Sequence, residues 1–240
     1  MLAVALHPAK MKILPLFYVI ISKMMKDDEI LLIDKPAGMS SFGVVARVRR
    51  KLSEEAGHKV KVGHTGTLDP FATGLLILLT GKGTKRANEF LKLDKEYIAT
   101  IRLGAKSTTG DIEGEIVENE VDRVEINKVK EVVKGFLGEI DQRVPSYSAV
   151  KINGQRAYKL ARAGKEVEMP VRKVTIYNTE ILDYKWPELK IRCEVSSGTY
   201  IRALGQDIGE KLGVGGYLTE LRRTKVGKYK VEEAEKLFAK

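Results

Sequence analysis

The stretch 63-GHTGTLDPFATGLL-76 sets a short polar loop directly before an apolar run. Two glycines in the loop allow positive φ angles and a close approach of the backbone to a ligand. Pro70 fixes the chain after Asp69 and removes a donor near that carboxylate. The continuous apolar run 74–80 predicts a buried strand, which would hold the loop rigidly. A carboxylate on such a loop is a candidate nucleophile or base, although Asp69 could also serve only as the cap of an Asx-turn.

On the N-terminal side of this loop the pattern predicts one strand and one helix. Glu29–Ile33 is a short apolar strand that ends in a turn rich in Pro and Gly. Ser40 and Ser41 can cap a helix over Phe42–Glu55, whose apolar residues have helical spacing. The outer face of this helix is basic, with Arg47, Arg49, Arg50 and Lys51.

On the C-terminal side, strand and helix patterns alternate irregularly. The expected strands are Tyr97–Leu103, 115–117, Val171–Leu182, Leu189–Val195 and a strand pair or bent strand over Leu218–Tyr229. The expected helices are Lys85–Leu93, Ile126–Phe136, Gln155–Arg162, Thr199–Leu212 and Val231–Phe238. Because no regular βαβ order and no internal repeat is present, the chain is predicted to be an α+β protein. Its mixed sheet should be largely antiparallel and flanked by helices.

Charge and composition restrict the class of partner. The 240 residues are 43% hydrophobic and 31% charged, which is typical of a globular protein with a real core. The formal net charge of +10 favours an anionic partner such as a nucleic acid. A basic run near the C-terminal end could contact phosphates or could be an ordinary solvated face. It comprises Arg222, Arg223, Lys225, Lys228 and Lys230.

Cysteine and histidine usage argues against disulfide and metal chemistry. Cys193 is the single cysteine and lies on the apolar side of an alternating segment, so it is predicted to be a small core residue. The three histidines lack the spacing of metal ligands. We therefore expect no metal and a reducing, cytoplasmic location.

Residues 1–26 differ from the rest of the chain. They contain four lysines, no acid and the apolar run 13-ILPLFYVII-21. This run is similar to the apolar part of a signal peptide or to a membrane-surface segment, but it is too short to span a bilayer. We expect an N-terminal extension of unknown role, or a start codon assigned too early with Met24 or Met25 as the true start.

Four motifs in order resemble those of the tRNA pseudouridine synthase B (TruB) family. The loop GHTGTLDPFATGLL is similar to the catalytic motif of that family, and LLIDKPAGMSS at Leu31–Ser41 is similar to its first motif. Lys95-Glu96-Tyr97 resembles its tyrosine motif, and SGTYIR at 197–202 resembles its third motif. The resemblance covers roughly Ile30 to Val231 and implies the pseudouridine synthase fold.

The resemblance implies three catalytic residues. Asp69 falls on the catalytic aspartate, Tyr97 on the tyrosine that stacks on the target base and is proposed to move a proton, and Arg202 on the arginine that pairs with the carboxylate. A guanidinium beside Asp69 would favour its ionised form, as the chemistry requires. From pattern alone, Tyr97 could instead be a core aromatic, and Arg202 a surface residue of its helix.

The same resemblance implies the residues that bind the substrate. His64 falls on the residue that enters the T-loop as the target base flips out, and Tyr200 and Leu221 fall on residues of the uracil pocket, which Tyr97 also lines. Base flipping costs a few kcal/mol, which stacking and pocket contacts offset. Without the resemblance, His64 could be a solvated turn residue and the other two plain core residues.

The implied activity is isomerisation of the uridine at position 55 of tRNA, through base flipping and formation of a C-glycoside that depends on Asp69. The expected substrate is the T-arm stem-loop, with no cofactor, no protein partner and no membrane, and with a monomeric enzyme. Residues 27–240 would form the catalytic domain, without the C-terminal RNA-binding (PUA) domain of most relatives, as in a standalone bacterial type. A protein that binds or folds RNA without chemistry is the alternative function, and membrane association through Ile13–Ile21 is a third reading.

Overall fold

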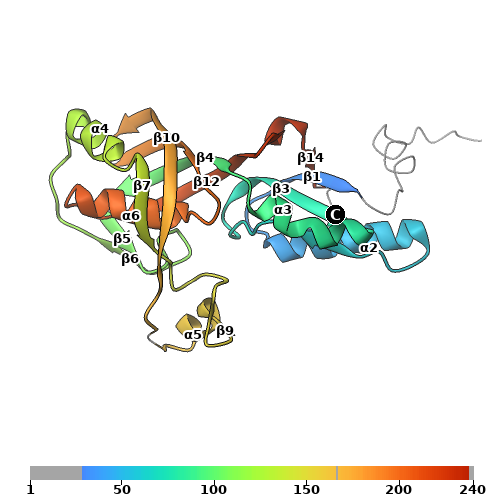
Figure 1. Ribbon diagram of the computed structural model, residues 1–240. Coiled ribbons are helices and arrows are strands. Elements are labelled where there is room, and N and C mark those ends of the chain that lie inside the picture. Colours follow the sequence, from blue (N-terminus) through green and yellow to red (C-terminus); the bar gives the residue numbers. More distant parts are fainter. Residues whose placement is uncertain (1–28, 166, 238–240) are drawn as a thin grey trace, which may run out of the picture.

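The computed structural model describes residues 29–165 and 167–237 (Figure 1). Within them, the main sheet contains β14 (Glu235–Lys236), β1 (Ile30–Lys35), β3 (Thr73–Thr80), β12 (Gly216–Val226), β4 (Lys95–Leu103), β11 (Glu188–Val195), β10 (Val171–Lys185) and β7 (Gly138–Arg143), in this spatial order. Two further strands, β2 (Val62–His64) and β13 (Tyr229–Lys230), pair with β3 and β12. The β1–β14 and β3–β12 pairs are parallel and the other pairs are antiparallel, which confirms the predicted mixed sheet.

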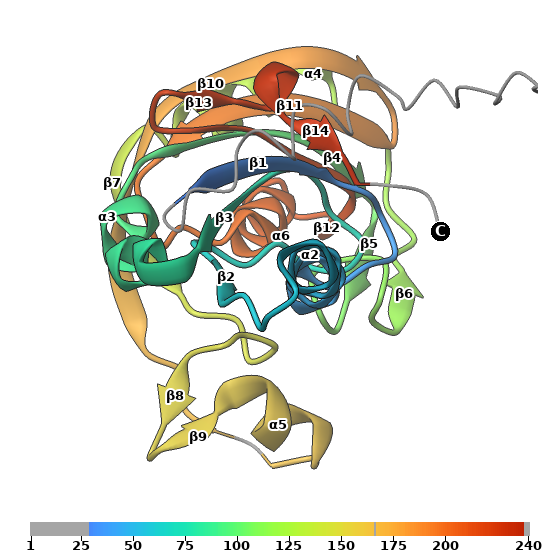
Figure 2. The same cartoon turned by 90° about the vertical axis from the view of Figure 1, so that its right-hand side faces the viewer.

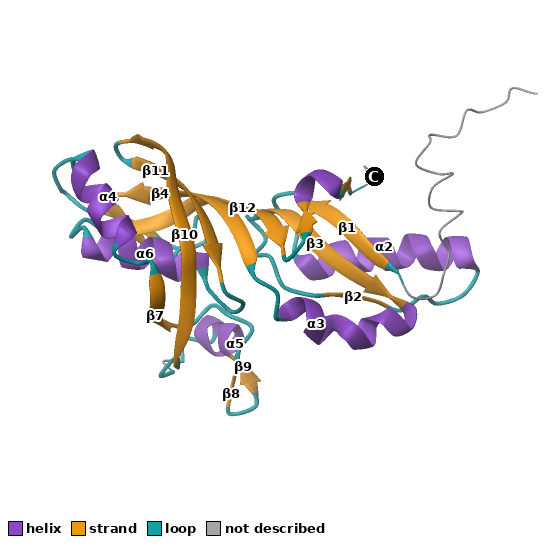
Figure 3. Ribbon diagram, turned by 45° about the horizontal axis from the view of Figure 1, so that its top comes forward, coloured by secondary structure: helices purple, strands orange, loops and turns teal. Residues whose placement is uncertain are grey.

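Helices cover the sheet in two lobes (Figures 1 and 3). One lobe contains α2 (Ser41–Ala56) and α3 (Ala87–Leu91), the latter preceded by the 3₁₀ helix η1 (Gly81–Arg86). The other contains α4 (Ile126–Lys134) and α6 (Ile201–Lys211), which contact each other and pack on β10, β12 and β4. The long strand β12 joins the lobes, because it pairs with β3 on one edge and with β4 on the other. Residues far apart in sequence therefore meet at this junction.

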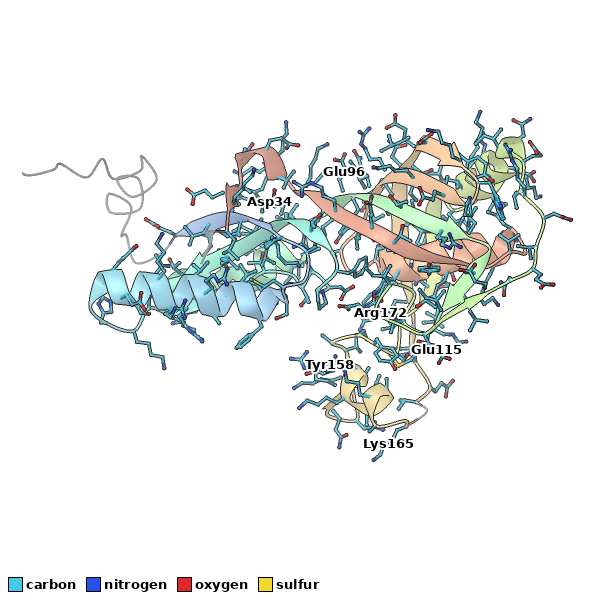
Figure 4. All side chains as sticks on the ribbon, turned by 180° about the vertical axis from the view of Figure 1, so that it is seen from behind. Asp34, Glu96, Glu115, Tyr158, Lys165 and Arg172 are labelled. Atoms are coloured by element: carbon cyan, nitrogen blue, oxygen red, sulfur yellow. The ribbon has the colours of Figure 1, made fainter. Side chains whose placement is uncertain are left out.

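A small arm projects from the sheet between β7 and β10. It consists of β8 (Lys151–Ile152), β9 (Gln155–Arg156) and α5 (Ala157–Arg162), and Figure 4 labels Tyr158 and Lys165 on it. A second two-stranded sheet, β5 (Ala105–Ser107) with β6 (Ile116–Glu118), lies next to β12. The arm has its own apolar cluster around Val144, Ala157 and Met169, so it is a packed element.

Most of the predicted elements are present near their expected bounds. The helix after Ser40 begins at Ser41, and the Ser40 side chain accepts a hydrogen bond from the N–H of Gly43 at 3.0 Å. Val44, Val45 and Val48 are buried as predicted, whereas Phe42 is 66% exposed, and Cys193 is a core residue with 1% exposure. Among the described residues no helix is long and apolar enough to cross a bilayer. The extension 1–26 lies outside the described residues.

The prediction of a terminal helix over 231–238 was wrong. The described part of this segment is a single 3₁₀ turn, η2 (Val231–Glu233), followed by β14. β14 pairs in parallel with β1, with Ile33 opposite Glu235. A strand at the edge of a sheet presents unpaired N–H and C=O groups. Pairing with the open edge of β1 satisfies more of these groups than one isolated helical turn would.

Candidate active site

The loop that carries Asp69 is clamped on several sides. The hydroxyl of Ser41 donates to the carbonyl of Leu68 and accepts from the N–H of Leu68, both at 2.8 Å. The N–H of Thr65 donates to the carbonyl of Ile77 at 3.0 Å, which ties the start of the loop to β3. The residue immediately before Asp69 is therefore fixed to the first turn of α2, as the sequence predicted for a rigid loop.

Gly74 is required by the close approach of two strands. Its φ angle is +101°, and a Cβ at this position would lie 2.3 Å from the carbonyl oxygen of Arg223. The neighbour is backbone and cannot rotate away, so a side chain would separate β3 from β12. Such a shift would move the loop that contains Asp69.

Lys35 lies fully buried beneath this loop and is a residue that pattern reasoning did not single out. Its ammonium donates to the carbonyls of Pro36 at 2.9 Å, Met39 at 2.6 Å and Pro70 at 3.1 Å. Burial lowers the pKa of Lys35 to about 8, and the charge of Asp69 opposes this shift. Lys35 therefore joins the turn of the first motif to the loop of the second and adds positive charge below Asp69.

Arg202 is the centre of the site. Its Nε donates to Oδ2 of Asp69 at 2.8 Å, its Nη1 to the carbonyl of Thr109 at 2.7 Å, and its Nη2 to the carbonyl of Tyr147 at 2.9 Å. The Arg202 side chain is 5% exposed, whereas that of Asp69 is 34% exposed. The guanidinium is thus fixed on all sides, and the carboxylate it holds remains open to solvent. The surface reading of Arg202 is excluded.

A second carboxylate shares the same guanidinium. Oδ2 of Asp111 lies 3.4 Å from Nε of Arg202, and the Asp111 side chain is 3% exposed. Its other oxygen accepts from the hydroxyl of Thr109 at 2.6 Å and from the N–H of Glu113 at 3.0 Å. Burial, Asp111 and Asp69 together raise the pKa of Glu113. Sequence reasoning missed Asp111 because it lies in the polar stretch 107–114, outside every predicted helix and strand.

Gln142 positions the start of α6. Its side-chain amide donates to the carbonyl of Tyr200 at 3.1 Å, and its Oε1 accepts from the N–H of Tyr200 at 2.8 Å. Gln142 is 1% exposed and lies on β7. Because Tyr200 comes two residues before Arg202, this pair of hydrogen bonds fixes where the guanidinium enters the site. Nothing in the local pattern of β7 indicated this role.

For Arg223, a member of the basic run near the C-terminal end, both predicted roles, a phosphate contact and a solvated position, were wrong. Arg223 is 3% exposed, and its guanidinium donates to the carbonyls of Leu75 at 2.8 Å and Gly66 at 3.2 Å. It therefore neither contacts phosphate nor belongs to a solvated face. It holds the Asp69 loop against β3, and the alternation of β12 puts its side chain inside.

The neighbours of Arg223 are paired with carboxylates. Arg222 makes two hydrogen bonds to Asp34, at 3.0 and 2.9 Å, and Lys225 donates to Glu96 at 2.8 Å. Figure 4 labels Asp34 and Glu96. These two charges join the strands of the junction between the lobes, so their pairing does not support phosphate contacts by Arg222 and Lys225. Lys228 and Lys230 are exposed, and for them the prediction stays open.

Two further predicted site residues, Tyr97 and Leu221, lie close to the pair formed by Asp69 and Arg202. Tyr97 and Leu221 are 8% and 7% exposed and belong to one cluster with Leu68 and Ile201, the residues that precede Asp69 and Arg202. Tyr97 lies on β4, opposite Arg223 of β12. Both side chains are thus core residues, and they pack against the two segments that carry Asp69 and Arg202.

Tyr200 and His64 lie at the edges of the site. Tyr200 is half-buried and packs against the apolar cluster of the arm. His64 ends β2, and its Nδ1 accepts from the N–H of Gly66 at 3.4 Å in the assigned tautomer. Burial and the nearby charge of Arg223 lower the pKa of His64. Both effects favour the neutral form of the imidazole.

The arrangement suits acid–base or nucleophilic chemistry by one carboxylate. Asp69 is oriented by a buried guanidinium, flanked by apolar residues and reachable from solvent. Among the described residues, no group of three or more His, Cys, Asp or Glu side chains could hold a metal ion.

The chain matches two models of one family of enzymes. The model of the TruB family pseudouridylate synthase N-terminal domain matches residues 49–201, and that of the tRNA pseudouridylate synthase B C-terminal domain matches residues 202–238. The chain is 48% identical over 212 residues to tRNA pseudouridine synthase B of Aquifex aeolicus, covering 88% of this chain and 72% of that protein. It is 46% identical over 210 residues to tRNA pseudouridine synthase B of Phocaeicola vulgatus, covering 87% and 89%.

Solved structures agree on the fold. The protein in the crystal structure of a Cbf5-Nop10-Gar1 complex matches with a TM-score of 0.67 and 33% identity over 87% of this chain. A second structure, the archaeal box H/ACA sRNP Nop10-Cbf5 complex, matches with a TM-score of 0.65 and 30% identity. The chain spans about half of each of those proteins, 52% and 53%.

Proposed function

This chain belongs to the TruB family of pseudouridylate synthases, and we propose that it converts the T-loop uridine at position 55 of tRNA into pseudouridine, with Asp69 as the catalytic carboxylate. The observation that carries the role of Asp69 is its 2.8 Å hydrogen bond from a guanidinium that is itself almost fully buried. The relatives named tRNA pseudouridine synthase B support the activity.

The reaction breaks the N1–C1′ bond of uridine, turns the uracil and joins C5 to C1′. The proton on C5 is lost and N1 gains a proton, so no group is imported and no electron is transferred. A carboxylate can attack C1′, attack C6 or remove the proton at C2′, and each route needs Asp69 in its ionised form. Arg202 supplies the adjacent positive charge and fixes the direction of the carboxylate. Asp111 lies 3.4 Å from the same Nε and places a second carboxylate beside the guanidinium.

The target base must leave its stack before Asp69 can reach it. In this proposal the neutral ring of His64 takes the space that the uracil vacates, because a ring without charge can stack among bases. Tyr97 offers a π-face to the extruded uracil and a hydroxyl that can carry the C5 proton. Leu221 and Tyr200 complete the pocket wall. The 8% exposure of Tyr97 requires local movement when the base enters.

We propose that residues 27–240 act as one catalytic domain and as a monomer in the cytoplasm, without a protein partner or cofactor. The Cbf5 proteins were solved as complexes with Nop10 and Gar1, or with Nop10. This chain matches only about half of each of those proteins, 52% and 53%. The similarity to tRNA pseudouridine synthase B extends over most of both chains and favours independent action.

Release of tritium from tRNA that carries [5-³H]uridine tests the proposal. The purified protein should release one equivalent of tritium per tRNA, and mapping by carbodiimide and primer extension should place the single pseudouridine at position 55. Modification confined to anticodon-arm uridines would contradict the substrate assignment. RNA binding without any tritium release would favour the alternative of a protein that binds RNA without chemistry.

A further inference from the structure

A groove of about 780 Å³ opens on the outer face of α2, away from the catalytic residues. Four of the residues that line it are cationic, and the others are small or hydroxylated. The cations are Arg47, Arg49, Arg50 and Lys59. No acidic side chain lines the groove, which makes it a concentrated positive surface on a chain of net charge +10.

The fold leaves these charges on the outside. Val44, Val45 and Val48 are at most 3% exposed and form the inner face of α2, which leaves Arg49 half-buried and Arg50 exposed. Arg50 has an acidic neighbour, Glu54, at 4.0 Å, but both side chains are at least 70% exposed. An ion pair in such contact with water is weak. Glu54 therefore compensates the charge of Arg50 only weakly.

The loop after α2 is fastened so that Lys59 faces the same groove. The hydroxyl of Ser53 donates to the carbonyl of Arg49 at 2.7 Å and accepts from the N–H of Val60 at 3.0 Å. This bridge joins the last turns of the helix to the segment that leads into β2. Lys59 is thus held beside the arginines by a defined backbone contact.

The groove lies at a defined distance from the site. Ser41, the first residue of α2, is hydrogen-bonded to Leu68, next to Asp69. At about 1.5 Å per residue, Arg49 is roughly 12 Å along the helix from Ser41. A nucleic-acid duplex covers that distance in about four base-pair steps of roughly 3 Å. Figures 1 and 2 place α2 and the arm on the same, lower side of the sheet.

We propose that this groove binds the sugar–phosphate backbone of the substrate RNA outside the target loop. The inference rests on the proposed function, because it assumes that the RNA enters between α2 and the arm with its target base at Asp69. Phosphate contacts by Arg and Lys fix the register and orientation of an RNA without selecting its sequence. The groove would then set affinity and position, while the loop residues select the base.

The test compares the triple variant Arg49→Ala/Arg50→Ala/Lys59→Ala with a matched control. The control, Lys130→Ala/Lys134→Ala/Lys211→Ala, removes the same three positive charges from exposed positions on α4 and α6 in the other lobe (Figure 1). Dissociation constants are measured for unmodified tRNA and for the isolated T-arm over a range of salt concentrations. Pseudouridine formation is measured in single turnover at saturating RNA.

The groove variant should bind tRNA roughly tenfold more weakly, and its slope of log affinity against log salt should be shallower by about 2. Its rate at saturation should equal that of the wild type. Weakening on the T-arm as well would locate the contact on that stem, whereas weakening on whole tRNA only would locate it beyond the arm. Both results support the groove as an RNA site.

The proposal would be overturned if the groove variant had the same RNA affinity and the same salt slope as the control. The groove would then bind an acidic protein or be filled by solvent only. A wild type that binds tRNA but forms no pseudouridine would instead contradict the proposed function, and the binding comparison would still be valid. Should the triple variant fail to fold, Lys59→Glu, a single change in an exposed loop, repeats the comparison.

Discussion

Replacing Arg223 by lysine should slow the reaction without weakening RNA binding. The planar guanidinium reaches Leu75 with Nε and Gly66 with Nη2, while Nη1 lies 3.5 Å from the carbonyl of Thr67. A lysine ammonium at this buried position can satisfy one of these carbonyls and leaves the others unpaired.

The size of the effect follows from these contacts. Each buried carbonyl without a donor costs about 1–3 kcal/mol, so loss of two contacts should lower the free energy of unfolding by about 3 kcal/mol. Gly66 lies three residues before Asp69 in the loop that these bonds hold. A displacement of about 1 Å at the reacting group costs roughly 100-fold in rate, which we expect for the single-turnover rate of Arg223→Lys.

Urea denaturation and single-turnover kinetics on a T-arm substrate measure the two effects, and Arg222→Lys is the matched control. Arg222 pairs with Asp34 at a partly exposed position, 39% and 21%, so its replacement should cost at most about 1 kcal/mol. A single-turnover rate and a free energy of unfolding equal to those of the wild type would mean that the carbonyl contacts of Arg223 do not hold the loop. That result would refute the structural role.

Three further changes probe the supports of the site. Asp111→Asn should slow the single-turnover rate roughly 10- to 100-fold at unchanged RNA affinity, because Arg202 loses its second charged neighbour; a rate equal to wild type would dismiss Asp111 as a positioning residue. Gln142→Leu leaves the N–H and C=O of Tyr200 unpaired, so it should lower the free energy of unfolding in urea by about 2–4 kcal/mol and slow the single-turnover rate. An unchanged free energy of unfolding would mean that the two hydrogen bonds of Gln142 do not fix Tyr200. The pKa of Lys35 is about 8 in the folded protein and about its ordinary 10.5 in the unfolded chain, so the free energy of unfolding should rise with pH between these two values. Urea denaturation of Lys35→Met at a series of pH values should lack this rise. Identical pH profiles for Lys35→Met and the wild type would contradict the lowered pKa.

The local sequence pattern was sufficient to predict the elements whose apolar residues follow the period of a helix or form one continuous run. The helical spacing of Val44, Val45 and Val48 predicted α2, and the apolar run before Thr80 predicted β3. Those elements hold the loop that carries Asp69, so the rigidity of this loop could be inferred without coordinates. The pairing of Asp69 with Arg202 followed from the family resemblance and is confirmed at 2.8 Å.

The supports of the site were missed because burial of a polar side chain depends on residues far away in sequence. Lys35 meets Pro70, Arg223 meets Gly66, and Gln142 meets Tyr200. A charged or polar residue is assumed to face water unless a partner is known, and none of these partners lies within the same element. The strand β7 was missed for a related reason, since Ile140 is the one apolar residue among its six.

The central claim, that Asp69 performs the chemistry, is tested most directly by tritium release from a [5-³H]uridine T-arm under single-turnover conditions with Asp69→Asn. The asparagine keeps an oxygen that can accept from Arg202 Nε, so the site should stay assembled and RNA should bind as in the wild type. The account predicts a release rate at least about 1,000-fold below that of the wild type, because an amide can neither attack the sugar or base nor take a proton. Release within about tenfold of the wild-type rate would contradict it.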